Sequence, residues 1–77
     1  MEEVFSGLEK YDKVEVALND MKNVIYKGQF RGFIKDVDNP VFDRNGSALW
    51  VTADQGFELM INMVDIYHFV ITEKYKQ

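Results

Sequence analysis

The sequence predicts a mainly β domain in which a short N-terminal helix precedes five antiparallel strands, bent strongly into a small barrel. Three observations favour this fold. With 77 residues, the chain can enclose only one core. Apolar and polar residues alternate in several short segments, and turn-forming residues separate these segments. One long segment carries two glycines on one face, where a strand can bend while keeping its partners. Closure into a barrel would then remove exposed strand edges.

The N-terminal helix is expected over residues 2–11. Acidic residues at positions 2 and 3 suit the positive end of a helix dipole. Apolar residues then recur at helical spacing. They would form one buried stripe, made of Val4, Phe5, Leu8 and Tyr11.

The five strands are expected at residues 13–18, 24–35, 48–53, 57–63 and 66–73. Turn residues lie between most of them, at Asn19-Asp20-Met21-Lys22-Asn23, Asn45-Gly46 and Asp54-Gln55-Gly56. The whole chain, residues 1–77, is expected to form one domain, with the last four residues as a frayed tail.

The second strand decides the shape of the domain. Its even-numbered residues, from Val24 to Ile34, look like the core face and include Gly28 and Gly32. A long strand bent at glycines is how a small sheet curls over itself.

Composition narrows the class of protein. The hydrophobic fraction of 47% argues against disorder, and no apolar run is long enough to span a bilayer. The chain has no cysteine, so we expect no disulfides, no thiolate metal site and a cytoplasmic location. The sequence contains no nucleophile–base pair, phosphate-cradling loop or metal-ligand spacing. We therefore expect neither an enzyme nor a bound cofactor or metal.

Charge is distributed unevenly along the chain. The net charge is −4, which is unfavourable for general nucleic-acid binding, yet residues 21–35 contain four basic residues and no acid. Lys27, Arg31 and Lys35 lie on one face of the predicted strand, with Gln29 between them. This face is either a phosphate-contacting stripe or a solvated surface that deters edge aggregation.

Three other features of the sequence have simple structural interpretations. His68 falls on the predicted core face of the last strand, where a lone histidine is usually a hydrogen-bonded structural residue. The acidic stretch around Asp36 and Asp38 lacks the glycine and closing glutamate of a calcium loop. Trp50 is either a stacking platform for bases or, more commonly for a strand aromatic, part of the packing.

Two motifs resemble those of the Sm and Sm-like family. Residues 28–33 read Gly-Gln-Phe-Arg-Gly-Phe and run into an Asp- and Asn-bearing stretch at residues 36–39, as in the first family motif. Ile61 and Ile66 match the ends of the second motif, although Asn62-Met63 replaces its Arg-Gly or Lys-His pair. The loop at residues 40–47 is longer than the family usually has.

The resemblance implies a homo-oligomeric ring of five to eight subunits, joined by pairing the fourth strand of one subunit with the fifth strand of the next. It also implies that single-stranded RNA binds around the pore without catalysis. The residues expected to contact RNA, together with the basic stripe, are Asp36, Asn39, Asn62, Lys27, Arg31 and Lys35.

The last two strands carry apolar residues on both faces, so a partner subunit is expected to cover one of them. The residues expected at this interface are Met60, Tyr67, Phe69 and Ile71. The alternative is that the N-terminal helix covers this surface. A rival function also stays open, in which the acidic domain binds another protein as an adaptor or inhibitor and does not bind nucleic acid.

Overall fold

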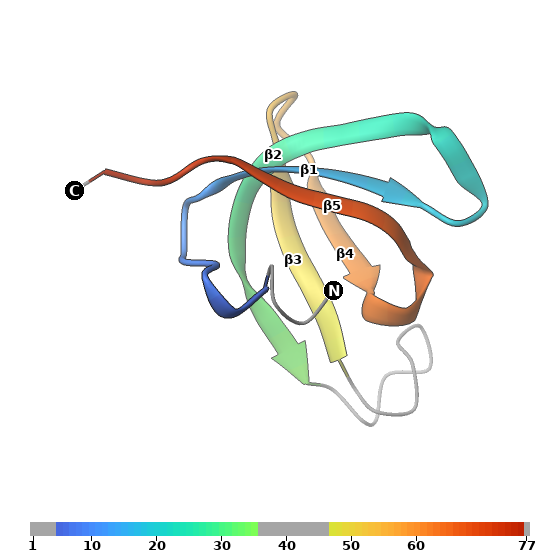
Figure 1. The fold of residues 1–77 in the computed structure, drawn as a ribbon, viewed down its shortest axis with the longest axis horizontal. Helices are drawn as coiled ribbons and strands as arrows, with labels where there is room; N and C mark the ends of the chain where they lie inside the picture. The colour runs from blue at the N-terminus through green and yellow to red at the C-terminus, as the bar shows by residue number, and fades with distance from the viewer. Residues whose placement is uncertain (1–4, 36–46, 77) are drawn as a thin grey trace.

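The computed structural model describes residues 5–35 and 47–76 and contains five antiparallel strands in one sheet (Figure 1). The strand order is β4-β3-β2-β1-β5. The strands are β1 (Lys13–Leu18), β2 (Met21–Lys35), β3 (Ser47–Ala53), β4 (Glu58–Asn62) and β5 (Ile66–Glu73). A short 3-10 turn, η1 (Met63–Asp65), joins β4 to β5. The predicted mainly β fold is confirmed, and β1 and β5 have the predicted bounds. The predicted turn at residues 21–23 is wrong, because β2 begins at Met21, which pairs with Leu18.

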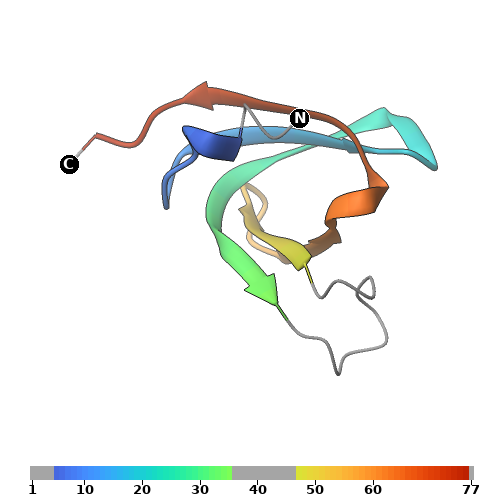
Figure 2. The ribbon, with the colours of Figure 1, turned by 60° about the horizontal axis from the view of Figure 1, so that its bottom comes forward.

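The long strand β2 belongs to two halves of the sheet. β1 pairs with β2 from Met21 to Gln29, and β3 pairs with β2 from Gly28 to Lys35. The two partners therefore overlap only at Gly28 and Gln29. Figure 2 shows β2 curving between a layer that contains β1 and β5 and a layer that contains β3 and β4.

The two glycines of β2 have different roles. A Cβ atom added at Gly28 would lie 2.2 Å from the backbone oxygen of Thr52, so only glycine lets β3 approach here. Gly32 has a φ of 155° and follows a β-bulge that shifts the β2–β3 register between Phe30 and Gly32. Arg31 is the additional residue in this bulge, and the bulge turns its side chain differently from a regular strand residue.

The core lies between the two layers. Its buried members come from all five strands and are Val14, Val16, Phe30, Leu49, Val51, Ile61, Ile66 and Phe69. Phe5 and Leu8 pack against this cluster from the N-terminal segment. Val24, predicted on the core face of β2, is instead 42% exposed, because this half of β2 lacks β3 as a neighbour.

The predicted N-terminal helix is wrong for the described part of residues 2–11. Only Phe5 and Ser6 are helical, and the chain turns at Gly7, which is a poor helix former. The amide of Glu9 donates a hydrogen bond to the carboxylate of Asp12, which competes with helical bonding. Tyr11 then has a φ of 76°, so the residue predicted to close the buried stripe leaves it. Residues 2–4 lie outside the described residues.

Strand β5 departs from simple alternation. Ala17 pairs with His68 but the next residue, Leu18, pairs with Ile66, so Tyr67 is additional at this point. Ile66 and Phe69 are therefore both buried, whereas His68 is exposed. The prediction that His68 faces the core is wrong, because the bulge reverses the alternation.

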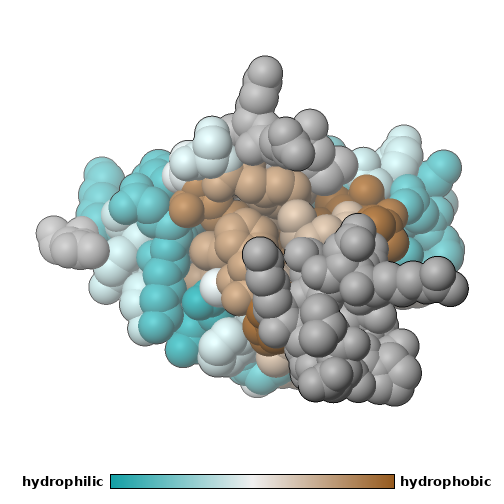
Figure 3. Space-filling model, turned by 90° about the horizontal axis from the view of Figure 1, so that it is seen from below, coloured by the Kyte–Doolittle hydropathy of each residue, from teal (hydrophilic) through white to brown (hydrophobic). Residues whose placement is uncertain are grey.

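Large apolar side chains remain exposed on the described surface. In Figure 3, apolar surface lies in the middle of the face seen from below, with hydrophilic surface toward both ends. Counted over all faces of the described surface, the exposed large apolar residues are Met21, Val24, Ile25, Phe33, Phe57, Met60, Val64, Tyr67, Val70 and Tyr75. None of the helical turns in the described part of the chain has the length and apolar character of a membrane span.

Candidate functional site

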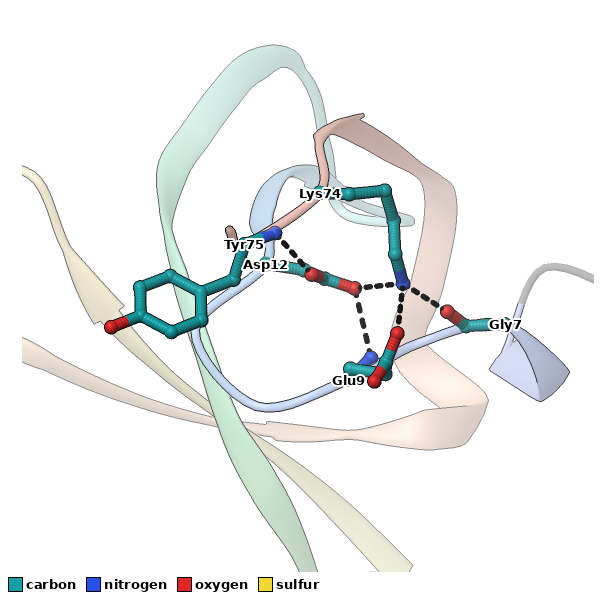
Figure 4. Close-up of polar contacts among 5 residues, drawn as sticks. All are labelled: Gly7, Glu9, Asp12, Lys74 and Tyr75. Atoms are coloured by element: carbon teal, nitrogen blue, oxygen red, sulfur yellow. Dashed lines mark hydrogen bonds and ion pairs between the residues drawn. The ribbon is translucent and has the colours of Figure 1, made fainter. Parts of the chain in front are cut away.

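The N-terminal segment and the C-terminal tail meet at the buried carboxylate of Asp12 (Figure 4). Asp12 is fully buried and accepts hydrogen bonds from the amides of Glu9 at 2.8 Å and Tyr75 at 2.7 Å. The ammonium group of Lys74 lies 2.5 Å from the same carboxylate and also contacts Glu9 and the backbone oxygen of Gly7. The tail at residues 74–75 is therefore anchored, contrary to the predicted frayed end.

The charge on Asp12 is well stabilised. Burial by itself raises the pKa of Asp12, but the hydrogen bonds from Lys74, Tyr75 and Glu9 outweigh it and hold the pKa below the ordinary value of 3.8. The same hydrogen bond from Lys74 to Asp12 raises the pKa of Lys74 above 10.5. Both groups are therefore ionised at neutral pH, and Asp12 acts as a structural anion that fixes the backbone of Tyr75.

A row of side chains in aromatic and cation–π contact runs from this anchor onto β3. The ring centroids of Tyr75 and Tyr11 are 5.2 Å apart, and the ring planes are tilted by 56°. The guanidinium of Arg31 lies 5.3 Å from the Tyr11 ring and 5.0 Å from the Trp50 ring. We call these four side chains, Tyr75, Tyr11, Arg31 and Trp50, the stacked row. Each contact is an aromatic pair or a cation–π pair, which are favourable in this distance range.

Hydrogen bonds fix the far end of the stacked row. Arg31 donates to the hydroxyl oxygen of Thr52 at 3.1 Å. The carboxylate of Glu58 accepts hydrogen bonds from Thr52 and from the indole nitrogen of Trp50, both at 2.7 Å. These two hydrogen bonds, helped by the charge of Arg31, hold the pKa of Glu58 below its ordinary value. Trp50 and Arg31 are thus held in place, and the Nε donor of Arg31 is buried without a hydrogen-bond partner among the described residues.

The near end of the stacked row borders a small cavity of about 180 Å³. Its lining consists of Tyr11, Lys13, Gln29, Glu73, Lys74, Tyr75 and Lys76. Three lysines against one glutamate give this lining a positive balance, although the whole chain carries a net charge of −4. Tyr75 is 48% exposed here, so one side of the row is open to solvent.

The backbone at Tyr11 is strained. A φ of 76° is uncommon for any residue except glycine, and an aromatic side chain makes it less favourable still. The conformation is held by hydrogen bonds on both sides, from the amide of Tyr11 to the oxygen of Phe30 and from the amide of Phe30 to the oxygen of Asp12. Strain of this kind concentrates at functional sites.

The structure separates the residues predicted to contact RNA. Arg31 belongs to the stacked row, whereas Lys27 is exposed on the part of β2 that extends beyond β3. Asn62 caps η1, where its side-chain oxygen accepts from the amide of Val64 at 3.2 Å. Asp36 and Asn39 lie outside the described residues. Lys35 ends β2, and its side chain is likewise not described.

The predicted interface residues also differ in their placement. Met60 on β4 is 45% exposed and Tyr67 on β5 is 51% exposed, whereas Ile71 is only partly buried and packs against the core. Phe69 is the exception: it is 8% exposed and contacts Phe5 with ring centroids 4.9 Å apart. Phe69 therefore packs within its own subunit, because the bulge at Tyr67 turns it inward.

Sequence reasoning missed the pairing of Tyr11 with Tyr75. The first was placed in a helix stripe and the second in the frayed tail. The sequence did contain a signal for this site, because each tyrosine has at least one lysine next to it, in Lys10-Tyr11 and in Lys74-Tyr75-Lys76. Interleaved basic and aromatic residues are typical of surfaces that contact nucleic acid.

A second hollow lies at the other end of β2. It has a volume of about 370 Å³ and is lined by Val24, Ile25, Tyr26, Lys27, Ala53, Asp54, Gln55 and Phe57. Among the residues at positions 5–35 and 47–76, no three histidine, aspartate or glutamate side chains are placed to hold a metal ion. Comparisons of the chain with protein-family models, curated proteins and solved structures find no match.

Proposed function

We propose that this chain is an Sm-like protein whose bent sheet curls into a small barrel that stays open between β4 and β5. It assembles into a homo-oligomeric ring and binds single-stranded RNA without catalysis, in the cytoplasm. The observation that carries the proposal is the pair of free sheet edges. Among the described strands, β4 pairs only with β3, and β5 pairs only with β1.

Free edges of this kind favour self-association. An edge strand presents unpaired backbone donors and acceptors, and apolar side chains along it strengthen pairing with another chain. Met60 on β4 and Tyr67 and Val70 on β5 are such exposed side chains. Pairing β4 of one copy with β5 of the next is a head-to-tail contact, which closes into a ring when the rotation from one subunit to the next divides a full turn into a whole number of steps. The Sm-like resemblance implies the same pairing and five to eight subunits.

The RNA part of the proposal has two supports. The Gly-Gln-Phe-Arg-Gly-Phe motif that resembles the family lies at the bend of β2, where Gly28 and Gly32 shape the strand. Asn62, at the position where the family has an RNA-contacting cation, lies at the start of η1 between β4 and β5. Without that cation, phosphate attraction at the pore is weaker, so we expect modest affinity with a shallow salt dependence there.

Fluorescence anisotropy with labelled U-rich and A-rich RNA oligonucleotides tests RNA binding. We expect saturable binding of at least one oligonucleotide at low salt and weaker binding at moderate salt. Flat titrations with both oligonucleotides up to high protein concentration would contradict RNA binding and would leave ring assembly intact.

The second candidate is an adaptor or inhibitor that binds another protein. The hollow of about 370 Å³ favours it, because Val24, Ile25 and Phe57 line it and are 42–44% exposed. A pull-down from nuclease-treated lysate separates the two candidates. Partners that survive nuclease treatment and are lost on Phe57→Ala would support this second function, whereas partners lost on nuclease treatment would support the first.

A further inference from the structure

We infer that the stacked row and its lysine-lined cavity form a stacking site for single-stranded nucleic acid on the outside of the sheet, separate from the Asn62 turn. This inference rests on the proposed function, since it assigns a second place on the chain where RNA is held. Its ligand is a planar base that carries a phosphate.

The open end of the row is suited to a base. Tyr75 is 48% exposed, and its ring contacts that of Tyr11 with the centroids 5.2 Å apart and a tilt of 56°. A base that stacks on Tyr75 would extend a row that already continues through Tyr11 and Arg31 to Trp50. Stacking of this kind tolerates any base sequence, because every base has a π face.

The charges around the row select the ligand. Lys13, Lys74 and Lys76 line the cavity against one acid, Glu73. Lys74 is held by Asp12 and Glu9, but Lys13 has only an exposed pairing with Asp54 at 3.4 Å, which a phosphate can replace at little cost. Lys76 and Lys13 therefore attract an anionic aromatic ligand and repel a lysine- or arginine-rich peptide, so we choose nucleic acid over a peptide.

The site is preorganised. The backbone of Tyr75 is fixed by the buried carboxylate of Asp12. The strained conformation of Tyr11 is held by the hydrogen bond from its amide to the oxygen of Phe30 and by the one from the amide of Phe30 to the oxygen of Asp12. Because these rings are already positioned, little conformational entropy is lost when a base binds.

The cavity volume limits the ligand. About 180 Å³ is below the roughly 300–1,000 Å³ of cavities that enclose drug-sized ligands, so one base fits and a whole dinucleotide cofactor does not. Gln29 in the lining offers both a donor and an acceptor to a base edge.

Tyr75→Ala tests the site directly. The alanine keeps the backbone amide that bonds Asp12, so circular dichroism should show an unchanged fold. In anisotropy titrations with labelled oligo(U) and oligo(A), we expect this variant to bind about tenfold more weakly, because the stacking of one base on the tyrosine ring is lost. Tyr75→Phe, which keeps the ring, should bind like the wild type. Met21→Ala is the control, because Met21 is 42% exposed and lines neither hollow.

A second measurement does not depend on any variant. Photo-crosslinking of the wild-type protein to 4-thiouridine-containing RNA, followed by mass spectrometry, should place the crosslink on the peptide that contains Tyr75 or Tyr11. Matched oligodeoxythymidine in the titration shows whether the site distinguishes RNA from DNA, and binding of either supports the inference.

The outcomes separate the two proposals. If wild-type protein binds neither RNA nor DNA, RNA binding by this chain is contradicted and the inference fails with it. If the wild type binds but Tyr75→Ala binds equally well and crosslinks fall elsewhere, the inference fails and the proposed function stands. Binding of an arginine-rich peptide that is lost in Tyr75→Ala would also overturn the choice of nucleic acid.

Discussion

The carboxylate of Asp12 and the ammonium group of Lys74 lie 2.5 Å apart, although 62 positions separate them in the sequence. This ion pair joins the segment before β1 to the segment after β5 (Figure 4). Asp12 is fully buried, whereas the side chain of Lys74 is 47% exposed, so the carboxylate of the ion pair is removed from water and the ammonium group is partly solvated. It holds the stacked row in place, because Tyr11 and Tyr75 are the immediate neighbours of the two residues.

The first prediction concerns the anchor itself. Asp12→Asn should lower the free energy of unfolding by about 2–3 kcal/mol, because the new amide group cannot accept all the buried hydrogen bonds that the carboxylate accepts. Denaturant unfolding followed by the fluorescence of Trp50, the chain's single tryptophan, measures this change. The control is Asp65→Asn, which removes an exposed carboxylate and should change the free energy by less than about 0.5 kcal/mol. Equal effects of the two variants would show that Asp12 is not an anchor.

The second prediction is the pH dependence of stability. The pKa of Asp12 is lower in the folded state than its ordinary value of 3.8, so its contribution is complete above pH 3.8. That contribution is lost as the pH falls from 3.8 through the folded pKa. The pKa of Lys74 is raised above 10.5, so its contribution is present below pH 10.5 and is lost as the pH rises through the folded pKa.

The contribution of the Asp12–Lys74 pair to stability should therefore be constant between pH 3.8 and pH 10.5. The free energy of unfolding, determined at a series of pH values, measures this contribution. In Asp12→Asn, the free energy of unfolding should fall less steeply at acid pH than it does in the wild type. Some acid dependence should remain from Glu58, whose pKa is also lowered. An acid limb that is identical in the wild type and in Asp12→Asn would contradict the prediction.

The third prediction concerns the bend of β2. Gly28→Ala places a Cβ atom 2.2 Å from the oxygen of Thr52, so β3 has to move away. We expect a loss of at least about 2–3 kcal/mol in the free energy of unfolding, or no folded protein. Gly7→Ala is the matched control, because a Cβ atom there meets nothing within 4 Å. Its thermal midpoint should stay close to that of the wild type, and a drop as large as that of Gly28→Ala would contradict this explanation of the bend.

The strands could be predicted because their signals are local. Alternation of apolar and polar residues, with Asn19-Asp20 and Asp54-Gln55-Gly56 between segments, is sufficient to place β1, the turns and most of β3 and β4. The glycines of β2 also indicated the bend. These features depend on residues close in sequence, and the tertiary structure did not override them.

The side-chain directions were less predictable because bulges reverse alternation. Tyr67 and Arg31 are each an additional residue in one strand, and no local pattern marks either of them. His68 and Phe69 consequently exchange their expected faces.

The candidate site was missed for a different reason. It combines Tyr11 with Tyr75, which are brought together by the pairing of Lys13 with Glu73 and by the contacts of Asp12 with Lys74 and Tyr75. A contact between the two ends of a chain has no signature in either end alone. The neighbouring lysines indicated that each tyrosine lies on a surface suited to nucleic acid. They did not indicate that the two tyrosines contact each other.

Ring assembly through β4 and β5 is tested most directly by the molar mass of the purified protein in solution, measured by light scattering after size-exclusion chromatography. We expect five to eight times the chain mass of 9.0 kDa. Met60→Glu combined with Tyr67→Glu should reduce the mass to that of one chain, because charges then line both edges. Met21→Glu, at a methionine 42% exposed against 45% for Met60, should leave the assembly intact. A wild-type mass of 9.0 kDa would contradict the ring, and a ring that survives the double variant would contradict pairing through these edges.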